Sequence, residues 1–139
     1  MIMLMSRSHS ILVVDDDNAT RAVVKTALRR AGHEAACASG EEQVTSLLKK
    51  LKFDLVITDV IMPGFDGLKV IEAVKQHQPG VAIVAMSGGG SCITSELCLT
   101  LAKVAGGAVP LPKPFHLEEL LGAVGAALHG SSAALVSDN

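Results

Sequence analysis

The sequence predicts an α/β fold in which helices cover both faces of a parallel sheet. Two observations carry this prediction. Short, continuously apolar segments alternate along the chain with longer segments of helical periodicity, which is the pattern of repeated strand–helix units. Hydrophobic residues make up 49% of the 139 residues, yet aromatic residues make up only 2%. The core must therefore consist mainly of Val, Leu, Ile and Ala, which is typical of a sheet buried on both faces.

Five short apolar segments are expected to form the strands. They are residues 11–14, 33–38, 55–58, 81–86 and 108–111. Pro110 lies in the last segment, and proline has no N–H to donate to a strand ladder, so this strand is expected at an edge of the sheet. A flavodoxin-like strand order of 2-1-3-4-5 places it there and gives a three-layer, doubly wound, five-stranded parallel sheet.

The segments between the strands carry helical signals. Asn18 is expected to cap a helix that runs to Ala31 and is closed by Gly32. Residues 68–77 are expected to form another helix. Apolar residues three and four positions apart mark three more helices. Their stripes are Val44, Leu47, Leu48 and Leu51; Ile93, Leu97, Leu101 and Val104; and Leu117, Leu120, Leu121, Val124 and Leu128.

The chain is expected to form a single domain. This domain covers residues 10–129, with terminal tails at residues 1–9 and 130–139, and its last helix ends near Gly130. The net charge of −2 argues against a basic surface for nucleic acids. No apolar stretch approaches the ~18 residues of a membrane span, and the apolar start is shorter than the core of a signal peptide. A cytoplasmic protein without membrane contact is therefore expected.

The cysteines and histidines show no pattern of ligands. The three cysteines, Cys37, Cys92 and Cys98, are odd in number and lack metal-ligand spacing, so they are predicted to be reduced thiols. The five histidines are scattered, and no functional role is predicted for any of them. They are His9, His33, His77, His116 and His129.

Polar residues follow four of the predicted strands. Asp15 and Asp16 follow the first, Asp59 the third, Ser87 the fourth and Lys113 the fifth, and functional groups of open parallel sheets gather at these ends. Two like charges ~4 Å apart repel by about 4 kcal/mol at an effective dielectric constant near ~20, so three converging carboxylates require a cation. Carboxylate oxygens and water suit Mg²⁺. A carboxylate can then act as nucleophile toward phosphorus and form an aspartyl phosphate.

Four motifs that contain these residues, and a fifth that follows shortly after Asp59, occur in order along the chain. They are Ile11-Leu12-Val13-Val14-Asp15-Asp16, Asp54-Leu55-Val56-Ile57-Thr58-Asp59, Met62-Pro63-Gly64-Phe65-Asp66-Gly67, Ala85-Met86-Ser87 and Lys113-Pro114-Phe115. Each motif alone is weak evidence, but all of them in order, each at the end of a predicted strand, form a specific signal. With them the chain resembles the response-regulator receiver family over residues 10–128, and in particular stand-alone receivers of the chemotaxis type.

The resemblance implies a role for each site residue. Asp59 would be the phosphoacceptor, and Ser87 and Lys113 would contact the bound phosphoryl group. The bond between Lys113 and Pro114 would be cis. The Mg²⁺ ligands that it implies are Asp15, Asp16, Asp59 and the backbone carbonyl of Ile61.

The resemblance also implies a phosphorylation switch and not an enzyme, with self-catalysed phosphorylation and dephosphorylation only. The phosphoryl donor would be a sensor histidine kinase or a histidine phosphotransfer protein. No DNA-binding or catalytic domain follows Gly130, so a stand-alone receiver that signals through another protein is expected. Phosphorylation would either switch binding to that protein or feed a relay in which the phosphoryl group passes to a histidine phosphotransfer protein. The sequence leaves both open.

Two departures from the family bear on output. Many receivers carry Tyr or Phe three residues before the lysine, where this chain has Pro110, whose ring cannot rotate inward. The segment before it is slightly longer than in many receivers and starts with Gly88–Gly90. We expect this glycine loop to act as a hinge for the helix over residues 93–104. Leu99 would face outward there, on a partner-binding face formed by the fourth helix, fifth strand and fifth helix.

Two enzyme-like alternatives fit the residues less well. A haloacid-dehalogenase-like phosphatase also uses an aspartate nucleophile and Mg²⁺, but it places a second aspartate two residues later as general acid. Ile61 stands at that position and has no proton to give. A flavin-binding electron carrier would need aromatic stacking residues and a hydroxyl-rich phosphate loop, which the sequence lacks.

Overall fold

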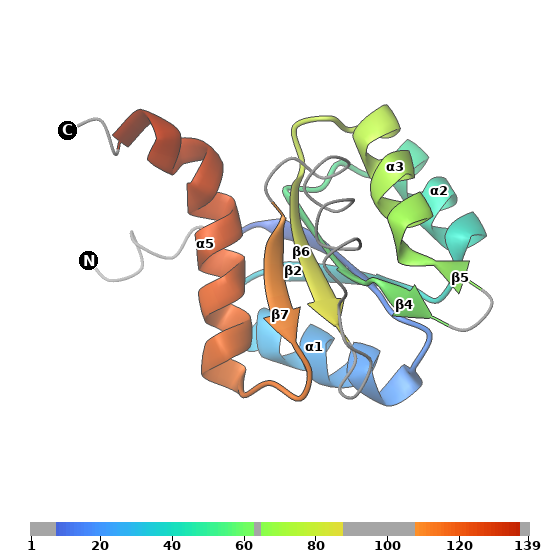
Figure 1. The fold of residues 1–139 in the computed structure, drawn as a ribbon, viewed down its shortest axis with the longest axis horizontal. Coiled ribbons are helices and arrows are strands. Elements are labelled where there is room, and N and C mark those ends of the chain that lie inside the picture. The colour runs from blue at the N-terminus through green and yellow to red at the C-terminus, as the bar shows by residue number, and fades with distance from the viewer. Residues whose placement is uncertain (1–7, 63–64, 88–107, 137–139) are drawn as a thin grey trace.

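The computed structural model describes residues 8–62, 65–87 and 108–136. Five parallel strands form the main sheet of this part of the chain (Figure 1). They are β1 (Ser10–Val14), β2 (Glu34–Ala38), β3 (Leu55–Asp59), β6 (Ala82–Ser87) and β7 (Val109–Pro112). Their order in the sheet is β2-β1-β3-β6-β7. Because β6 and β7 are the fourth and fifth strands of this sheet, the predicted order of 2-1-3-4-5 is confirmed.

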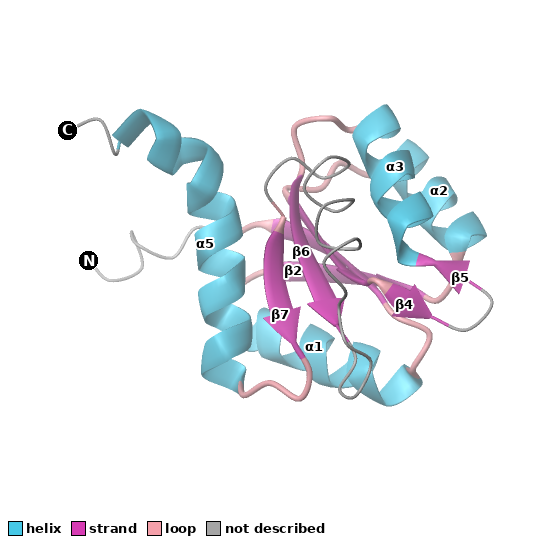
Figure 2. Cartoon of the chain, viewed as in Figure 1, coloured by secondary structure: helices cyan, strands magenta, loops and turns pink. Residues whose placement is uncertain are grey.

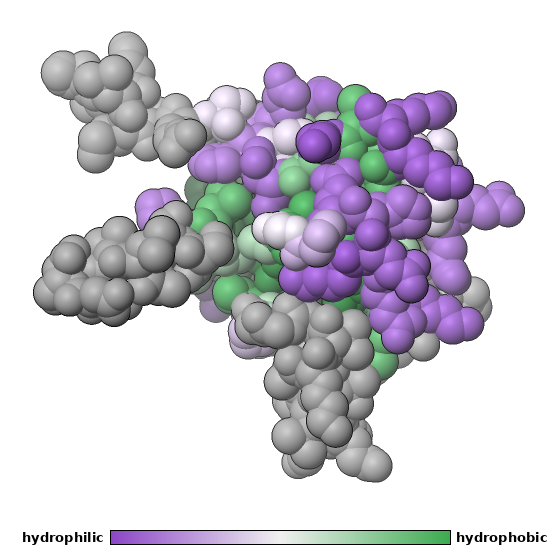
Figure 3. All heavy atoms as spheres, turned by 90° about the horizontal axis from the view of Figure 1, so that it is seen from above, coloured by the Kyte–Doolittle hydropathy of each residue, from purple (hydrophilic) through white to green (hydrophobic). Residues whose placement is uncertain are grey.

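Helices cover both faces of the sheet, as Figure 2 shows. The helices α1 (Asn18–Arg30) and α5 (Leu117–Val136) pack on one face, and α2 (Glu41–Lys50) and α3 (Gly67–His77) pack on the other. Side chains of a strand alternate between faces, so the core divides into two layers of mainly aliphatic residues. Figure 3 shows hydrophilic side chains gathered over the side of α2 and α3.

The edge position of β7 agrees with its proline content. Pro110 lies opposite Ala85 of β6, and Pro112 lies opposite Ser87. An edge strand needs hydrogen bonds along one side only, so missing N–H groups are tolerated there. The prediction that Pro110 marks an edge strand is confirmed.

The start of α1 differs from the prediction by one residue. Asp17, and not Asn18, is the N-cap, because its backbone is extended and its Oδ2 accepts hydrogen bonds from the Thr20 amide at 3.0 Å and the Thr20 hydroxyl at 2.6 Å. These bonds lower the pKa of Asp17. Gly32 closes the helix with a φ of 95°, as expected, because glycine adopts this left-handed conformation without strain.

Two further elements depart from the predictions. The last helix was expected to end near Gly130, but α5 continues to Val136. A helix that has already formed is extended at little cost, and the alanine and leucine residues of this segment have high helix propensity. Where a plain loop was expected after β3, β4 (Ile61–Met62) and β5 (Phe65–Asp66) pair as a short antiparallel ribbon.

Some predictions fall on other parts of the chain. The expected helix over residues 93–104, the glycine loop before it, Leu99, Cys92 and Cys98 all lie outside the described residues. Among the helices of the described part, none is long and apolar enough to cross a membrane.

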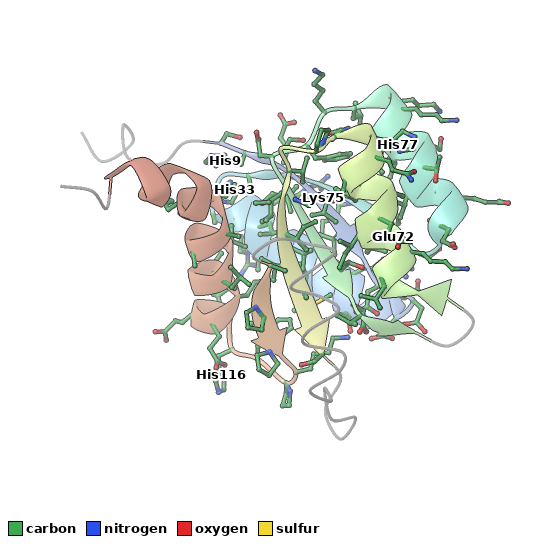
Figure 4. All side chains as sticks on the ribbon, turned by 45° about the horizontal axis from the view of Figure 1, so that its top comes forward. His9, His33, Glu72, Lys75, His77 and His116 are labelled. Carbon is green, nitrogen blue, oxygen red and sulfur yellow. The ribbon has the colours of Figure 1, made fainter. Side chains whose placement is uncertain are left out.

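His9 and His33 form a contact that the sequence did not predict. The His9 amide donates a hydrogen bond to His33 Nδ1 at 3.1 Å, and the ring centroids lie 5.5 Å apart (Figure 4). The bond requires a lone pair on His33 Nδ1, so a proton there would break it. Burial lowers the pKa of His33, and the charge of His9 lowers it further, while the charge of Asp54 acts in the opposite direction.

This contact predicts a loss of stability in mild acid. The folded state binds fewer protons at His33 than the unfolded state does, so the stabilisation is complete above the ordinary pKa of 6.5 and is lost as the pH falls through the lowered value. Urea denaturation between pH 7.5 and pH 5 should therefore show a smaller decline for His33→Gln than for the wild type. His129→Gln, an exposed control, should keep the wild-type decline. Equal declines in all three proteins would contradict the prediction.

Candidate functional site

Residues far apart in the sequence meet at the carboxyl ends of the strands. Asp15 follows β1, Asp59 ends β3, and Lys113 follows β7. Lys113 Nζ lies 2.8 Å from Asp15 Oδ2 and 2.9 Å from Asp59 Oδ2. The lysine is separated from these acids by 98 and 54 residues along the chain. One ammonium group therefore bridges two carboxylates that the parallel sheet brings together.

Three carboxylates converge beside this lysine. Oxygens of Asp15, Asp16 and Asp59 lie within 4.8 Å of one another. Asp15 is completely buried and Asp59 is 5% exposed, whereas Asp16 is open to solvent. Desolvation, a hydrogen bond with the Asp15 carboxyl and the charges of Asp15 and Asp59 raise the pKa of Asp16. Such repulsion favours a bound cation, and an open cluster of carboxylate oxygens fits a Mg²⁺ ion that keeps several waters.

The other predicted site residues lie at the same end of the sheet. Ser87 is the last residue of β6, and its carbonyl accepts a hydrogen bond from the Lys113 amide at 2.8 Å. Ile61 begins β4, directly after the turn that follows β3. The Lys113–Pro114 peptide bond is cis, as the resemblance implied.

The Lys113 ammonium depends on its two acidic partners. Burial by itself would lower the pKa of Lys113, but hydrogen bonds and charge interactions with Asp15 and Asp59 raise it overall. The side chain is 20% exposed, so the ion pairs are partly shielded from water and salt. The lysine is therefore held in its charged form at the centre of the site.

The sequence assigned no role to Gly67, although it lies in one of the motifs. Gly67 is the first residue of α3, and its amide donates to the Val60 carbonyl at 3.1 Å. It therefore packs directly on the backbone of the residue that follows Asp59. A Cβ at this position would lie 2.2 Å from the Asp59 carbonyl oxygen and 2.6 Å from Val60 Cα. Only glycine permits this close approach. In the sequence, the one feature that pointed to a special role for Gly67 was its position just after the turn-rich segment that contains Pro63 and Gly64.

Arg21 was also missed. Its Nη1 donates to the backbone carbonyl of Asp15 at 2.6 Å. The available signal was a cation placed one helical turn beyond a run of acids, but such residues are common on exposed helix surfaces. Its role becomes visible only when the path of the acidic segment is known.

An apolar hollow adjoins the site. It has a volume of about 480 Å³ and lies between the first half of α1 and the segment after β7. Its lining consists of Ala19, Thr20, Val23, Val24, Lys113, Pro114 and Phe115. Val23 also lines a second hollow that continues between α1 and α5, and this residue is 63% exposed. A strip of accessible apolar surface therefore leads to Lys113.

The sequence matches known proteins along most of its length. A family model described as the response regulator receiver domain matches residues 11–125. The DNA-binding transcriptional regulator NtrC of Azospirillum brasilense is 38% identical over 131 residues, which cover 93% of this chain and 26% of NtrC. The sensory/regulatory protein RpfC of Xanthomonas campestris pv. campestris is 33% identical, over 83% of this chain and 16% of RpfC. The chain thus spans only a small part of the curated relatives that it matches.

Solved structures show the same architecture. NtrX from Brucella abortus superposes with a TM-score of 0.82 at 27% identity, over 95% of this chain and 29% of that chain. The chemotaxis protein CheY4 of Vibrio cholerae gives a TM-score of 0.78 at 27% identity, over 88% of this chain and 100% of that chain. A beryllofluoride-activated NtrC4 receiver domain dimer gives a TM-score of 0.75 at 25% identity, over 87% of this chain and 97% of that chain.

The close packing at Gly67 predicts a specific intolerance to substitution. Gly67→Ala should lower the free energy of unfolding by about 1–3 kcal/mol, the usual range for an overpacked interior, because the new methyl group meets backbone atoms and not a flexible side chain. Gly122→Ala is the matched control, since a Cβ there meets no atom within 4 Å. That change lies within α5 and should stabilise by roughly 0.5–1 kcal/mol. Urea denaturation of both variants would test this, and equal stabilities would contradict it.

Proposed function

Because the chain belongs to the response regulator receiver domain family, we propose that it is a phosphorylation switch in which Asp59 accepts a phosphoryl group. The observation that supports this most directly is the bridge from Lys113 to Asp15 and Asp59. It places a nucleophilic carboxylate, a second acid and a fixed positive charge at one point. These are the groups that an acyl phosphate requires for its formation.

The proposed transfer uses the residues of the site as follows. A carboxylate oxygen of Asp59 attacks phosphorus while the bond from phosphorus to the donor's nitrogen breaks. The donor imidazole leaves with the electron pair of that bond. Asp15, Asp16, Asp59 and the backbone carbonyl of Ile61 would hold Mg²⁺, and the ion would supply positive charge for the phosphoryl oxygens. Lys113 provides a second positive charge, and Ser87 a hydroxyl, for the same oxygens.

The surroundings of the site support a protein as phosphoryl donor. The apolar hollow beside Lys113 and the exposed side chain of Val23 provide a surface that a partner could cover. Receiver domains of this kind interact with histidine kinases, so we propose a sensor histidine kinase or a histidine phosphotransfer protein as donor. Exposed apolar side chains would then align the donor histidine with Asp59.

A beryllofluoride-activated form of a similar receiver domain supports the switch. Beryllofluoride is a mimic of a phosphoryl group, and NtrC4 forms its activated dimer with it. We propose that phosphorylation of Asp59 likewise shifts this chain toward a state that binds a partner protein. The chain acts in this proposal as a switch and not as a metabolic enzyme, since Ile61 replaces the general acid of a haloacid-dehalogenase-like phosphatase.

The phosphoacceptor can be tested with a small-molecule donor. Wild type treated with acetyl phosphate and Mg²⁺ should gain one phosphoryl group by intact-mass spectrometry, whereas Asp59→Asn should gain none because its amide is not a nucleophile. Asp54→Asn, which lies just before the start of β3 and therefore at the opposite end of the sheet, is the matched control and should be phosphorylated like the wild type. A phosphoryl group that persists on Asp59→Asn would show that another residue is the acceptor.

The metal site can be tested by thermal melting. A ligand bound only by the folded state at one hundred times its Kd stabilises by about 2.7 kcal/mol, so the Tm should rise with Mg²⁺ concentration. Asp16→Ala should remove most of this rise because it deletes one of the three clustered carboxylates. Glu72→Ala removes an exposed acid on α3 (Figure 4) and should leave the rise unchanged. A wild-type Tm that is the same in Mg²⁺ and in EDTA would overturn the proposed metal site.

A further inference from the structure

Arg21 joins the acidic segment between β1 and α1 to the first turn of α1. Its Nη1 donates to the Asp15 carbonyl at 2.6 Å, and its Nη2 donates to the side-chain oxygen of Asn18. Its own amide donates to the Asp17 carbonyl at 3.1 Å. A single residue therefore contacts both the segment that carries the acids and the helix that follows it.

The Asp15 carbonyl needs a donor because it lies beyond the strand ladder. The pairing of β1 ends at Val14, opposite Ala38 of β2 and Thr58 of β3. Asp15 is completely buried, so water cannot easily replace the missing partner. The guanidinium of Arg21 thus donates to the Asp15 carbonyl where, in a longer strand, the backbone amide of a neighbouring strand would do so.

This hydrogen bond also orients Asp16. The carbonyl of Asp15 and the amide of Asp16 belong to one planar peptide unit, so a bond that fixes the carbonyl direction fixes the whole plane. That plane also contains the Asp16 Cα, so the hydrogen bond fixes the point from which the Asp16 side chain extends. Asp15 itself is held from the other side, because its Oδ1 accepts from the Asp17 amide at 2.9 Å and its Oδ2 accepts from Lys113.

Arg21 and Lys113 differ in what they contact. Lys113 bonds the carboxylate oxygens themselves, which a metal ion would also use. Arg21 bonds a backbone carbonyl and does not occupy any of those carboxylate oxygens. We propose that Arg21 is a positioning residue for Asp15 and Asp16, which holds their shared peptide so that both carboxylates can bind Mg²⁺. The proposal rests on the Mg²⁺ site of the proposed function.

Isothermal titration calorimetry with Mg²⁺ tests the proposal on the whole chain. Arg21→Ala should bind Mg²⁺ about tenfold more weakly than the wild type, since loss of a group that orients metal ligands commonly costs 10–100-fold in affinity. Arg21→Lys keeps the charge but lacks the planar fork that reaches both the Asp15 carbonyl and Asn18, so it should also bind weakly. Arg29→Ala removes an equal charge from the far end of α1 and should bind like the wild type.

A kinetic measurement separates positioning from a direct role in transfer. With acetyl phosphate, the Mg²⁺ concentration for half-maximal phosphorylation should rise about tenfold in Arg21→Ala, which matches the expected loss of affinity. The phosphorylation rate at saturating Mg²⁺ should stay close to that of the wild type. A lower plateau with an unchanged midpoint would overturn the proposal, and so would wild-type affinity in Arg21→Ala or full rescue by Arg21→Lys. A wild type that binds no Mg²⁺ would instead overturn the proposed metal site, and with it the role of Arg21.

Discussion

The balance of charge around Lys113 is the interaction on which the rest of the site depends. Three carboxylates lie within 4.8 Å of one another, and one of them is completely buried. Repulsion of about 4 kcal/mol per pair at ~4 Å, for an effective dielectric constant near ~20, would oppose this arrangement if no positive charge were present. Lys113 supplies that charge by contacting both Asp15 and Asp59. A change of charge at Asp59 would therefore act directly on an ion pair of the lysine.

The sheet explains why these groups meet. Parallel strands place all their carboxyl ends on one side of the sheet, so residues at or just after the ends of β1, β3 and β7 come together although they are far apart in sequence. Helices on both faces bury the strands, so the carboxyl ends of the strands form a packed base for the acids and the lysine. The edge strand β7 carries three closely spaced prolines in and after it, which restrict the backbone that leads to Lys113.

Backbone contacts hold the site in addition to the ion pairs. Gly67 packs on the backbone at Asp59, and Arg21 bonds the carbonyl of Asp15, so these two acids are supported at the main chain. Neither contact uses a carboxylate oxygen. These backbone contacts therefore hold the main chain of the two acids without adding to the bonds that Lys113 makes with their carboxylate oxygens.

The sequence by itself determined the order of the strands and the residues at their ends. Apolar segments and the acids that follow them are local features, and Pro110 indicates an edge strand because a missing N–H has the same effect in any fold. Three local features were not predicted, because neighbouring residues compete for the same role in each of them. They are Asp17 as the cap of α1, the continuation of α5 to Val136 and the β4–β5 ribbon. The roles of Gly67 and Arg21 were decided only by the tertiary structure. Gly67 contacts the backbone at Asp59 and Val60, and Arg21 contacts the backbone carbonyl of Asp15. Every residue has the same backbone atoms, so the residue types alone do not show which of these atoms come close together in the folded chain.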